Sequence, residues 1–161
     1  MSEKITITKS IEFDAGHRIP NHKSKCRYFH GHSYRLEVTL EGPVKADSGA
    51  SDEGMVLDFG DVKSVAMKIV HDPWDHAFLV WEKDTAARKA LAELGASHRT
   101  VVLPVIPTVE NLVQLVFLNL DSEYRKVYGT DLLLVKVRLF ETPTCWSDAS
   151  MKKENRSGKS D

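Results

Sequence analysis

The sequence has only two cysteines, almost no net charge and no long apolar run. Two cysteines, Cys26 and Cys145, are too few for a disulfide-stapled scaffold, and no apolar leader follows Met1, so we expect a cytoplasmic protein with free thiols. A formal net charge of -1 over 161 residues argues against a nucleic-acid partner. No apolar stretch approaches the roughly 20 residues of a membrane-spanning helix, so we expect no membrane partner.

Length and composition suit one domain. The 161 residues are 42% hydrophobic, which is enough to form a core, and the sequence contains no internal repeat. We therefore predict a single domain over residues 1–150. From Met151 the tail is polar and charged, so we predict that residues 151–161 are disordered.

Alternation of apolar and polar residues predicts strands. The first runs from Ile5 to about His17, and the clearest covers residues 34–40. A short apolar strand is predicted over residues 100–103, and a last strand over residues 132–140 leads directly to Glu141. The strand over residues 34–40 has one buried and one solvated face.

Apolar residues at helical spacing predict three helices, which begin at Asp61, Thr85 and Thr108. Asp61 and Thr108 are the residue types that cap helix N-termini. Pro73 ends the first helix, and we expect residues 72–79 to be irregular. Strands and helices together indicate an α+β domain.

The stretch from Cys26 to His32 carries the strongest chemical signal. Residues two apart in a strand share a face, so His30 and His32 can direct one nitrogen each at a common point. His17 ends another predicted strand and adds a third nitrogen if the two strands pair. Three nitrogens leave the fourth tetrahedral position to water or substrate, as in catalytic zinc sites. The alternative is a chance pair of histidines, since a two-residue motif has little specificity.

Cys26 has two interpretations. As a fourth zinc ligand it would close the site and make it structural; as a thiolate it would act as a base or nucleophile. Its basic neighbours Lys23, Lys25 and Arg27 favour the thiolate by charge, and such a charged stretch is not typical of a core. We favour the reactive role.

Six motifs in order resemble the 6-pyruvoyl-tetrahydropterin synthase family: FDAGHRIP, KCRYFHGHSY, GMVLDFGDVK, DHAFL, PTVENL and ETPT. Within the family, the chain is most similar to the bacterial branch that forms 6-carboxy-tetrahydropterin in queuosine biosynthesis. The resemblance covers nearly all of residues 5–145. It implies a tunnelling fold, in which an antiparallel four-stranded sheet carries helices on one face. It also implies a homo-oligomer, a trimer or a hexamer built from trimers, whose subunits join edge to edge into a barrel.

The resemblance also implies roles for individual residues. It makes Cys26 the proton-abstracting base, with Asp75 and His76 as its partners, often reached across a subunit boundary. The zinc ligands that it implies are His17, His30 and His32. The substrate contacts that it implies are Glu141 at the pterin, supported by Thr108, Glu110 and Thr142.

The acidic residues in this set, and His76, can also be explained without a functional role. By spacing alone, Asp75 and His76 suit a solvated turn. Glu141 could end a strand in water, and Glu110 could serve the dipole of a helix.

The activity implied is that of a zinc-dependent carbon–oxygen lyase. It converts 7,8-dihydroneopterin triphosphate to 6-carboxy-5,6,7,8-tetrahydropterin and releases acetaldehyde and triphosphate. The three-residue gap between Cys26 and His30 resembles that of the carboxy-forming branch. Residues 80–105 form a longer stretch than in the shortest bacterial members, so we expect a different rim of the site.

Three other functions remain open. A 6-pyruvoyl-tetrahydropterin synthase would use the same residues, and a non-catalytic pterin- or zinc-binding protein would have the metal closed off by Cys26. A zinc hydrolase would need a glutamate placed after the His-x-His pair, and the sequence offers none there.

Overall fold

A long antiparallel hairpin lies at the centre of the fold. The computed structural model describes residues 3–151, and in it β1 (Lys4–His17) pairs with β2 (His30–Pro43) along their whole length. The predicted alternation is confirmed in β1, where Ile11, Phe13 and Ala15 are buried between more exposed neighbours. β2 begins before the alternating run at residue 34, so that it includes the His-x-His pair.

The sheet has six strands in the order β4-β3-β1-β2-β5-β6. The four added to the hairpin are β3 (Ala77–Trp81), β4 (Thr100–Leu103), β5 (Leu133–Thr142) and β6 (Cys145–Ser150). The prediction of an antiparallel four-stranded sheet is therefore wrong in number and direction. β3 runs parallel to the end of β1 and β4 parallel to β3, whereas the β1–β2, β2–β5 and β5–β6 pairs are antiparallel.

The two strands that the sequence did not predict have weak local signals. β3 begins inside the segment over residues 72–79 that we expected to be irregular and extends to Trp81. The polar pair Asp75 and His76 precedes it, and only Ala77–Leu79 pairs with β1. β6 is mostly exposed and polar, so it shows no apolar face from which a strand could be predicted.

The three predicted helices are present. They are α1 (Phe59–Ala66), which continues through the π-helical η2 (Met67–His71) into α2 (Asp72–Trp74), then α3 (Thr85–Glu93) and α4 (Val109–Tyr128). Thr108 caps α4 as predicted. The predicted cap at Asp61 is wrong, because the side chain of Asp58 accepts from the backbone N–H of Gly60 at 2.6 Å and starts α1 one turn earlier.

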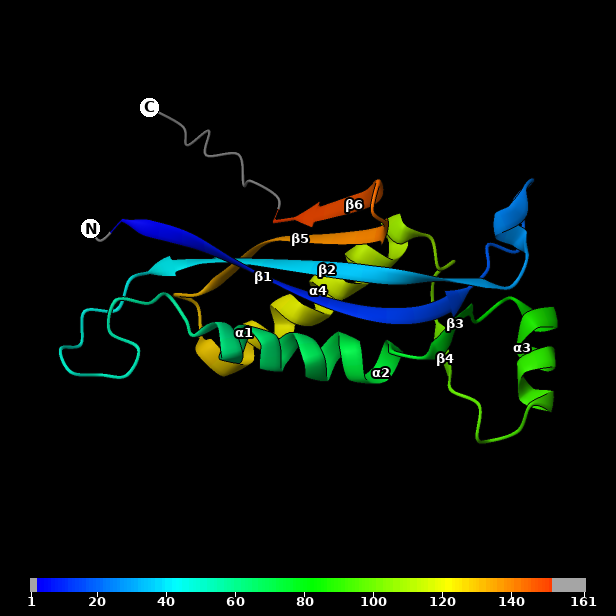
Figure 1. The fold of residues 1–161 in the computed structure, drawn as a ribbon, viewed down its shortest axis with the longest axis horizontal. Helices are drawn as coiled ribbons and strands as arrows, with labels where there is room; N and C mark the ends of the chain where they lie inside the picture. Colours follow the sequence, from blue (N-terminus) through cyan, green and yellow to red (C-terminus); the bar gives the residue numbers. More distant parts are fainter. Residues whose placement is uncertain (1–2, 152–161) are drawn as a thin grey trace, which may run out of the picture.

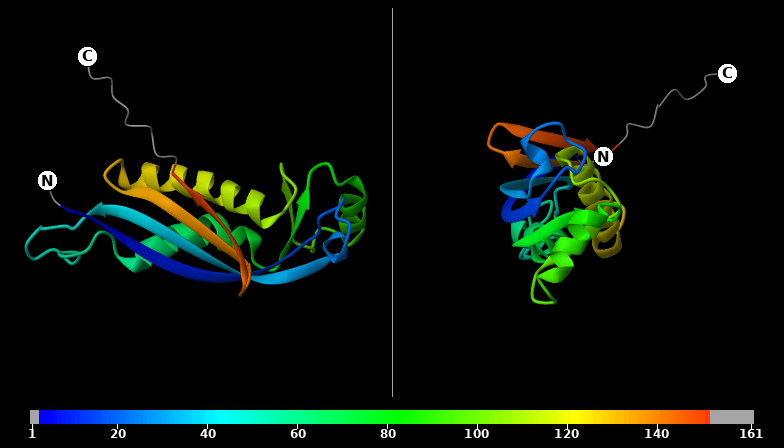
Figure 2. Two further views of the ribbon diagram at one scale, coloured as in Figure 1. Left: turned by 90° about the horizontal axis from the view of Figure 1, so that it is seen from above. Right: turned by 90° about the vertical axis from the view of Figure 1, so that its right-hand side faces the viewer.

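Helices α1 and α4 cover one face of the curved sheet and leave the other face open (Figures 1 and 2). The strands and helices meet in one apolar core, and the hydroxyl of Tyr124 on α4 donates to the carbonyl of Val62 on α1 at 2.8 Å. Helices on one face were predicted, and this is confirmed. Because alternate residues of β1 face the helices, His17 lies on the same side as Phe13 and Ala15 and is buried.

Helix α3 packs elsewhere. With β3 it forms a second, small apolar cluster of Val80, Ala87 and Leu91. This unit lies at the same end of the molecule as the β1–β2 connection, which contains the short 3-10 helix η1 (Lys25–Arg27) (Figure 1).

Two sequence-based predictions fall outside this description. The predicted disordered tail lies almost wholly in residues 152–161, beyond the described residues. Joining of subunits at their sheet edges stays a prediction. Within residues 3–151, no helix combines the length and the apolar character needed to cross a membrane.

Candidate metal centre

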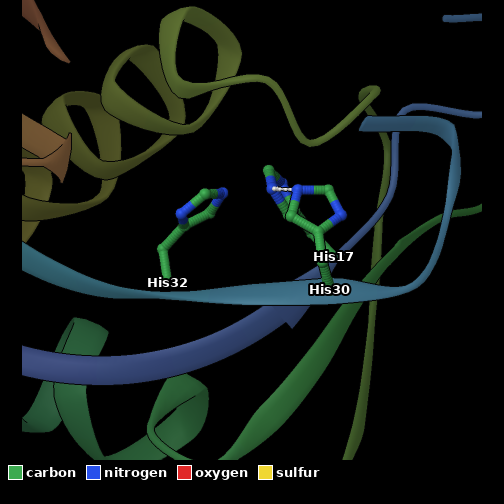
Figure 3. A group of neighbouring side chains, drawn as sticks. All are labelled: His17, His30 and His32. Atoms are coloured by element: carbon green, nitrogen blue, oxygen red, sulfur yellow. Dashed lines mark hydrogen bonds between the residues drawn. The ribbon is translucent and has the colours of Figure 1, made fainter. Parts of the chain in front are cut away.

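Three imidazoles converge where β1 ends and β2 begins. His17 and His30 are direct partners in the antiparallel register, and His32 lies two residues further along the same face of β2. Each ring offers one nitrogen, and the three nitrogens lie within 4.8 Å of one another (Figure 3). The three histidines predicted from spacing therefore form one group that could hold a metal ion.

Two main-chain carbonyls orient these rings. The Nδ1 atom of His17 lies 2.7 Å from the carbonyl oxygen of Pro107, and that of His30 lies 2.7 Å from the carbonyl oxygen of Tyr28. A carbonyl can only accept, so both Nδ1 atoms carry the proton and each neutral ring keeps a lone pair at Nε2. Such outer hydrogen bonds are typical of metal-binding histidines.

The remaining nitrogens of this pair fit a cation between them. The Nε2 atoms of His17 and His30 are 3.0 Å apart (Figure 3), and in neutral rings both present lone pairs. A hydrogen bond between them would need one ring to be charged. In a tetrahedral site with zinc–nitrogen bonds of 2.0–2.1 Å, ligand nitrogens are about 3.3 Å apart, close to the separation found here.

Burial favours the neutral forms of His17 and His32. It is the main cause that lowers the pKa of His17 to about 4; the nearby His30 and His32 also lower this pKa, whereas the hydrogen bond to the Pro107 carbonyl raises it. The pKa of His32 is also lowered, first by burial and then by His30. Both rings are therefore free of an extra proton at neutral pH and available as ligands.

Glu141 lies beside this group at the end of β5. Its Oε1 atom is 3.6 Å from Nε2 of His17 and 3.9 Å from Nε2 of His32. Burial raises the pKa of Glu141, and the neighbouring Glu110 raises it further. The carboxylate is thus partly removed from water, unlike a glutamate that merely ends a strand.

The N-terminus of α4 also reaches the site. Thr108 caps this helix, because its Oγ1 atom accepts from the backbone N–H of Asn111 at 3.3 Å. The preceding residue, Pro107, holds His17, and Glu110 lies in the first turn.

Thr142 is directed elsewhere. Although it follows Glu141, it lines a cavity of about 350 Å³ together with Glu12, Arg35 and Phe140. The side chains of Glu12 and Arg35 alternate with the buried residues of β1 and β2, so this cavity lies on the open face of the sheet.

Asp75 and His76 form a hydrogen-bonded pair at the start of β3. Nδ1 of His76 donates to Oδ2 of Asp75 at 2.8 Å, and Oδ1 of Asp75 accepts from the backbone N–H of Asp14 at 3.0 Å. The latter bond is the main cause that lowers the pKa of Asp75. The His76 side chain is 73% exposed, and its backbone has a left-handed φ of 56°. Within residues 3–151, neither side chain is hydrogen-bonded to Cys26.

Cys26 is a half-buried free thiol in η1. Its carbonyl accepts from the backbone N–H of Ile19 at 2.7 Å, which closes the loop between the two strands. The group of convergent ligands found in the described residues consists of the three histidines, without this thiol.

Sequence reasoning missed the carbonyls of Pro107 and Tyr28. A main-chain carbonyl has no residue type that a motif could reveal. The one available signal was position, since Tyr28 lies two residues before His30 and Pro107 directly precedes the cap of α4.

Comparison with known proteins identifies the relatives of this chain. The family model described as 6-pyruvoyl tetrahydropterin synthase matches residues 6–152. The chain belongs to the 6-pyruvoyl tetrahydropterin synthase family. The 6-carboxy-5,6,7,8-tetrahydropterin synthase of Rickettsia bellii is 36% identical to this chain, in an alignment that covers 88% of this chain and 97% of the relative. The enzyme of the same name from Haemophilus influenzae is 33% identical, in an alignment that covers 88% of this chain and 96% of the relative.

Solved structures agree with this family assignment. The 6-pyruvoyl tetrahydropterin synthase of Caenorhabditis elegans has a TM-score of 0.63 and 25% identity, covering 94% of this chain and 98% of that one. An uncharacterized protein from Wolinella succinogenes, 20% identical, shares the fold with a TM-score of 0.74 over 94% of this chain and 100% of its own. The six-stranded sheet described above is thus this chain's version of the family fold.

We predict that substitution of one ligand histidine abolishes tight metal binding. His32→Ala should lower the affinity by more than about 100-fold, because loss of an outer hydrogen-bond partner alone costs about 10- to 100-fold. Metal content after dialysis against a weak chelator measures this. His98→Ala is the control, since that ring bonds only to Thr100 within the described residues. Full metal content in His32→Ala would remove this residue from the ligand set.

Proposed function

We propose that this chain is a zinc-dependent carbon–oxygen lyase that converts 7,8-dihydroneopterin triphosphate to 6-carboxy-5,6,7,8-tetrahydropterin, with release of acetaldehyde and triphosphate, in queuosine biosynthesis. The observation that carries this proposal is the group of three convergent imidazoles with a half-buried glutamate beside it. The names of the relatives from Rickettsia bellii and Haemophilus influenzae support the carboxy-forming branch.

His17, His30 and His32 would hold the zinc and leave a fourth position open to the substrate. When bound there, zinc would polarise the hydroxyls of the substrate side chain and make the adjacent C–H more acidic. The Pro107 and Tyr28 carbonyls fix two of the three rings. The reaction then needs only a base and a means of holding the pterin.

Glu141 would hold the pterin. A pterin presents an edge of adjacent N–H donors, and a carboxylate can accept two of them in a fork, as it does from arginine. Because Glu141 lies 3.6 Å from His17, a ring bound to it would lie next to the metal position. Thr108 and Glu110, in and before the first turn of α4, are the proposed supporting contacts. Thr142 is a weaker candidate, since it faces the other side of the sheet.

Cys26, a half-buried free thiol in the loop that joins His17 to His30, would take the proton. Asp75 and His76 would complete the base from a neighbouring subunit, for which the 73% exposure of His76 leaves room. The proposal therefore includes a homo-oligomer built on trimers. Two free cysteines fit a reducing cytoplasm, where we place the enzyme.

The direct test is to load the protein with zinc, add 7,8-dihydroneopterin triphosphate and identify the pterin product by mass spectrometry. We expect 6-carboxy-tetrahydropterin together with acetaldehyde. A 6-pyruvoyl product would assign the chain to the other branch. Binding of the substrate without turnover would make it a pterin-binding protein and contradict the proposal.

We predict that Cys26→Ala retains fold and metal but loses most turnover. Removal of a positioned base costs roughly two to four orders of magnitude in rate. Turnover and metal content are measured on the same preparation, with Cys145→Ala as the control for loss of a free thiol. Unchanged turnover would assign the base elsewhere, whereas loss of metal would indicate that Cys26 is a ligand.

We predict that Glu141→Gln weakens pterin binding far more than metal binding. The amide offers one acceptor and one donor to an edge of donors, so a buried group loses its partner at a cost of about 1–3 kcal/mol, or roughly 10- to 100-fold in affinity. Titration of a pterin analogue into zinc-loaded protein measures the change.

The matched control is Glu37→Gln, since the side chain of Glu37 is 25% exposed and that of Glu141 24%. Glu37 lies on β2 and contacts Arg35 rather than the imidazoles. Equal affinity of wild type and Glu141→Gln would show that the pterin is held by another group, of which Glu110 is the nearest candidate.

A further inference from the structure

Asp84 is a buried carboxylate that the proposed chemistry does not use. It is only 6% exposed and directly precedes α3. Its Oδ2 atom accepts from Nε of Arg18 at 2.6 Å, and its Oδ1 atom accepts from Nη2 of Arg18 at 2.7 Å and from the backbone N–H of Ala87 at 3.1 Å. The carboxylate therefore caps α3 and holds Arg18 in a two-pronged fork.

Arg18 connects this carboxylate to both ends of the loop that contains Cys26. It directly follows the ligand His17, and its guanidinium carbon lies 5.7 Å from the ring centre of Phe29, which directly precedes the ligand His30. Phe29 in turn packs on Phe78 of β3, with ring centres 4.6 Å apart. The start and the end of the loop are thus held at one point.

The loop itself is tied to that point by its backbone. Ile19, the residue after Arg18, donates its N–H to the carbonyl of Cys26 at 2.7 Å. Two residues beyond Cys26, the carbonyl of Tyr28 holds the ring of His30. A movement of Arg18 would therefore be passed through one hydrogen bond to Cys26.

Capping alone does not account for this arrangement. A serine or asparagine would cap α3 as well as an aspartate does. An ion pair with a buried carboxylate is an inefficient way to stabilise a fold, because loss of hydration of the carboxylate offsets much of the attraction. What the fork does provide is a fixed position and orientation for Arg18.

We propose that Asp84, acting through Arg18, is a positioning residue that sets the place of Cys26 relative to the three imidazoles. The inference rests on the proposed function, in which Cys26 takes the proton. It gives a role to the segment over residues 80–105, which carries Asp84 and α3 to the end of the molecule where the loop lies (Figure 1).

The first test is Asp84→Asn, which keeps the cap on α3 but removes the charge and one acceptor. We expect kcat for 7,8-dihydroneopterin triphosphate to fall by about 10- to 100-fold, since a misplacement of about 1 Å has that effect. KM and zinc content should stay within about threefold, because Asp84 contacts neither substrate nor metal in this account. Arg18→Lys keeps the charge but cannot form the fork, so we expect the same fall in kcat, with KM and zinc content again little changed.

The matched control is Asp148→Asn. It breaks another two-pronged pair, in which Asp148 accepts from Nε and Nη2 of Arg138 at 2.6 and 2.8 Å on the open face of the sheet. This variant should keep kcat within about twofold, as surface pairs contribute little. An Asp84→Asn protein that folds, binds zinc and keeps its kcat would overturn the proposal. Arg18→Lys decides in the same way if Asp84→Asn does not fold.

The second test reports position without turnover. Iodoacetamide labels both free thiols, and mass spectrometry gives the rate at Cys26 relative to that at the exposed Cys145 of the same chain. In Asp84→Asn and Arg18→Lys this ratio should change by more than about threefold, because the surroundings of one thiol alter and those of the other do not. An unchanged ratio in both variants would contradict the positioning role.

A double variant separates this inference from the proposed function. If Asp84 acts through Cys26, adding Asp84→Asn to Cys26→Ala should cause no further fall in kcat. A full additional fall would show that Asp84 acts by another route. If Cys26→Ala alone keeps its turnover, the proposed base is wrong, and the alkylation ratio still decides whether Asp84 positions the loop.

Discussion

The antiparallel register of β1 and β2 is the constraint on which the candidate site depends. It sets His17 opposite His30 and places His32 on the same face. The register is determined by the apolar pairs further along the hairpin, where Ile11 faces Leu36 and Phe13 stacks on Tyr34 with ring centres 5.3 Å apart. A slip by one residue would turn a strand's histidines to the open face together with its core residues. Core and metal group are therefore specified by one alternating pattern.

The helices that cover this face also set the protonation of the site. Burial lowers the pKa of His17 and raises that of Glu141, so the imidazole of His17 is neutral and the carboxylate is partly desolvated. The two effects have one physical cause, since low polarity disfavours any charge that lacks a partner. A metal ion among the imidazoles would supply an opposite charge near the Glu141 carboxylate, and a pterin edge would supply hydrogen-bond donors to it.

Local sequence pattern predicted the parts of the fold whose signal is local. The alternation of β1, the helical spacing of α4 and the cap at Thr108 were all visible. β3 and β6 were not, because a short strand after a polar pair and an exposed strand have no amphipathic pattern. Their pairing depends on neighbours distant in the sequence.

In the candidate site, too, the residues with a local sequence signal were predicted and the contacts between distant residues were not. Spacing grouped His30 and His32, and His17 joined them on the condition that the two strands pair, which they do. Glu141 was placed there through the family resemblance and then found 3.6 Å from His17. The contacts that were missed involve groups without a sequence signal. They are main-chain carbonyls and the Arg18–Asp84 pair, whose members are 66 residues apart.

The central claim is that three imidazoles hold the metal and Cys26 remains free to act as a base. X-ray absorption at the zinc edge of the zinc-loaded protein tests it most directly. The account predicts only nitrogen or oxygen neighbours, at about 2.0–2.1 Å. A sulfur neighbour at about 2.3 Å would make Cys26 a ligand, close the site and contradict the account.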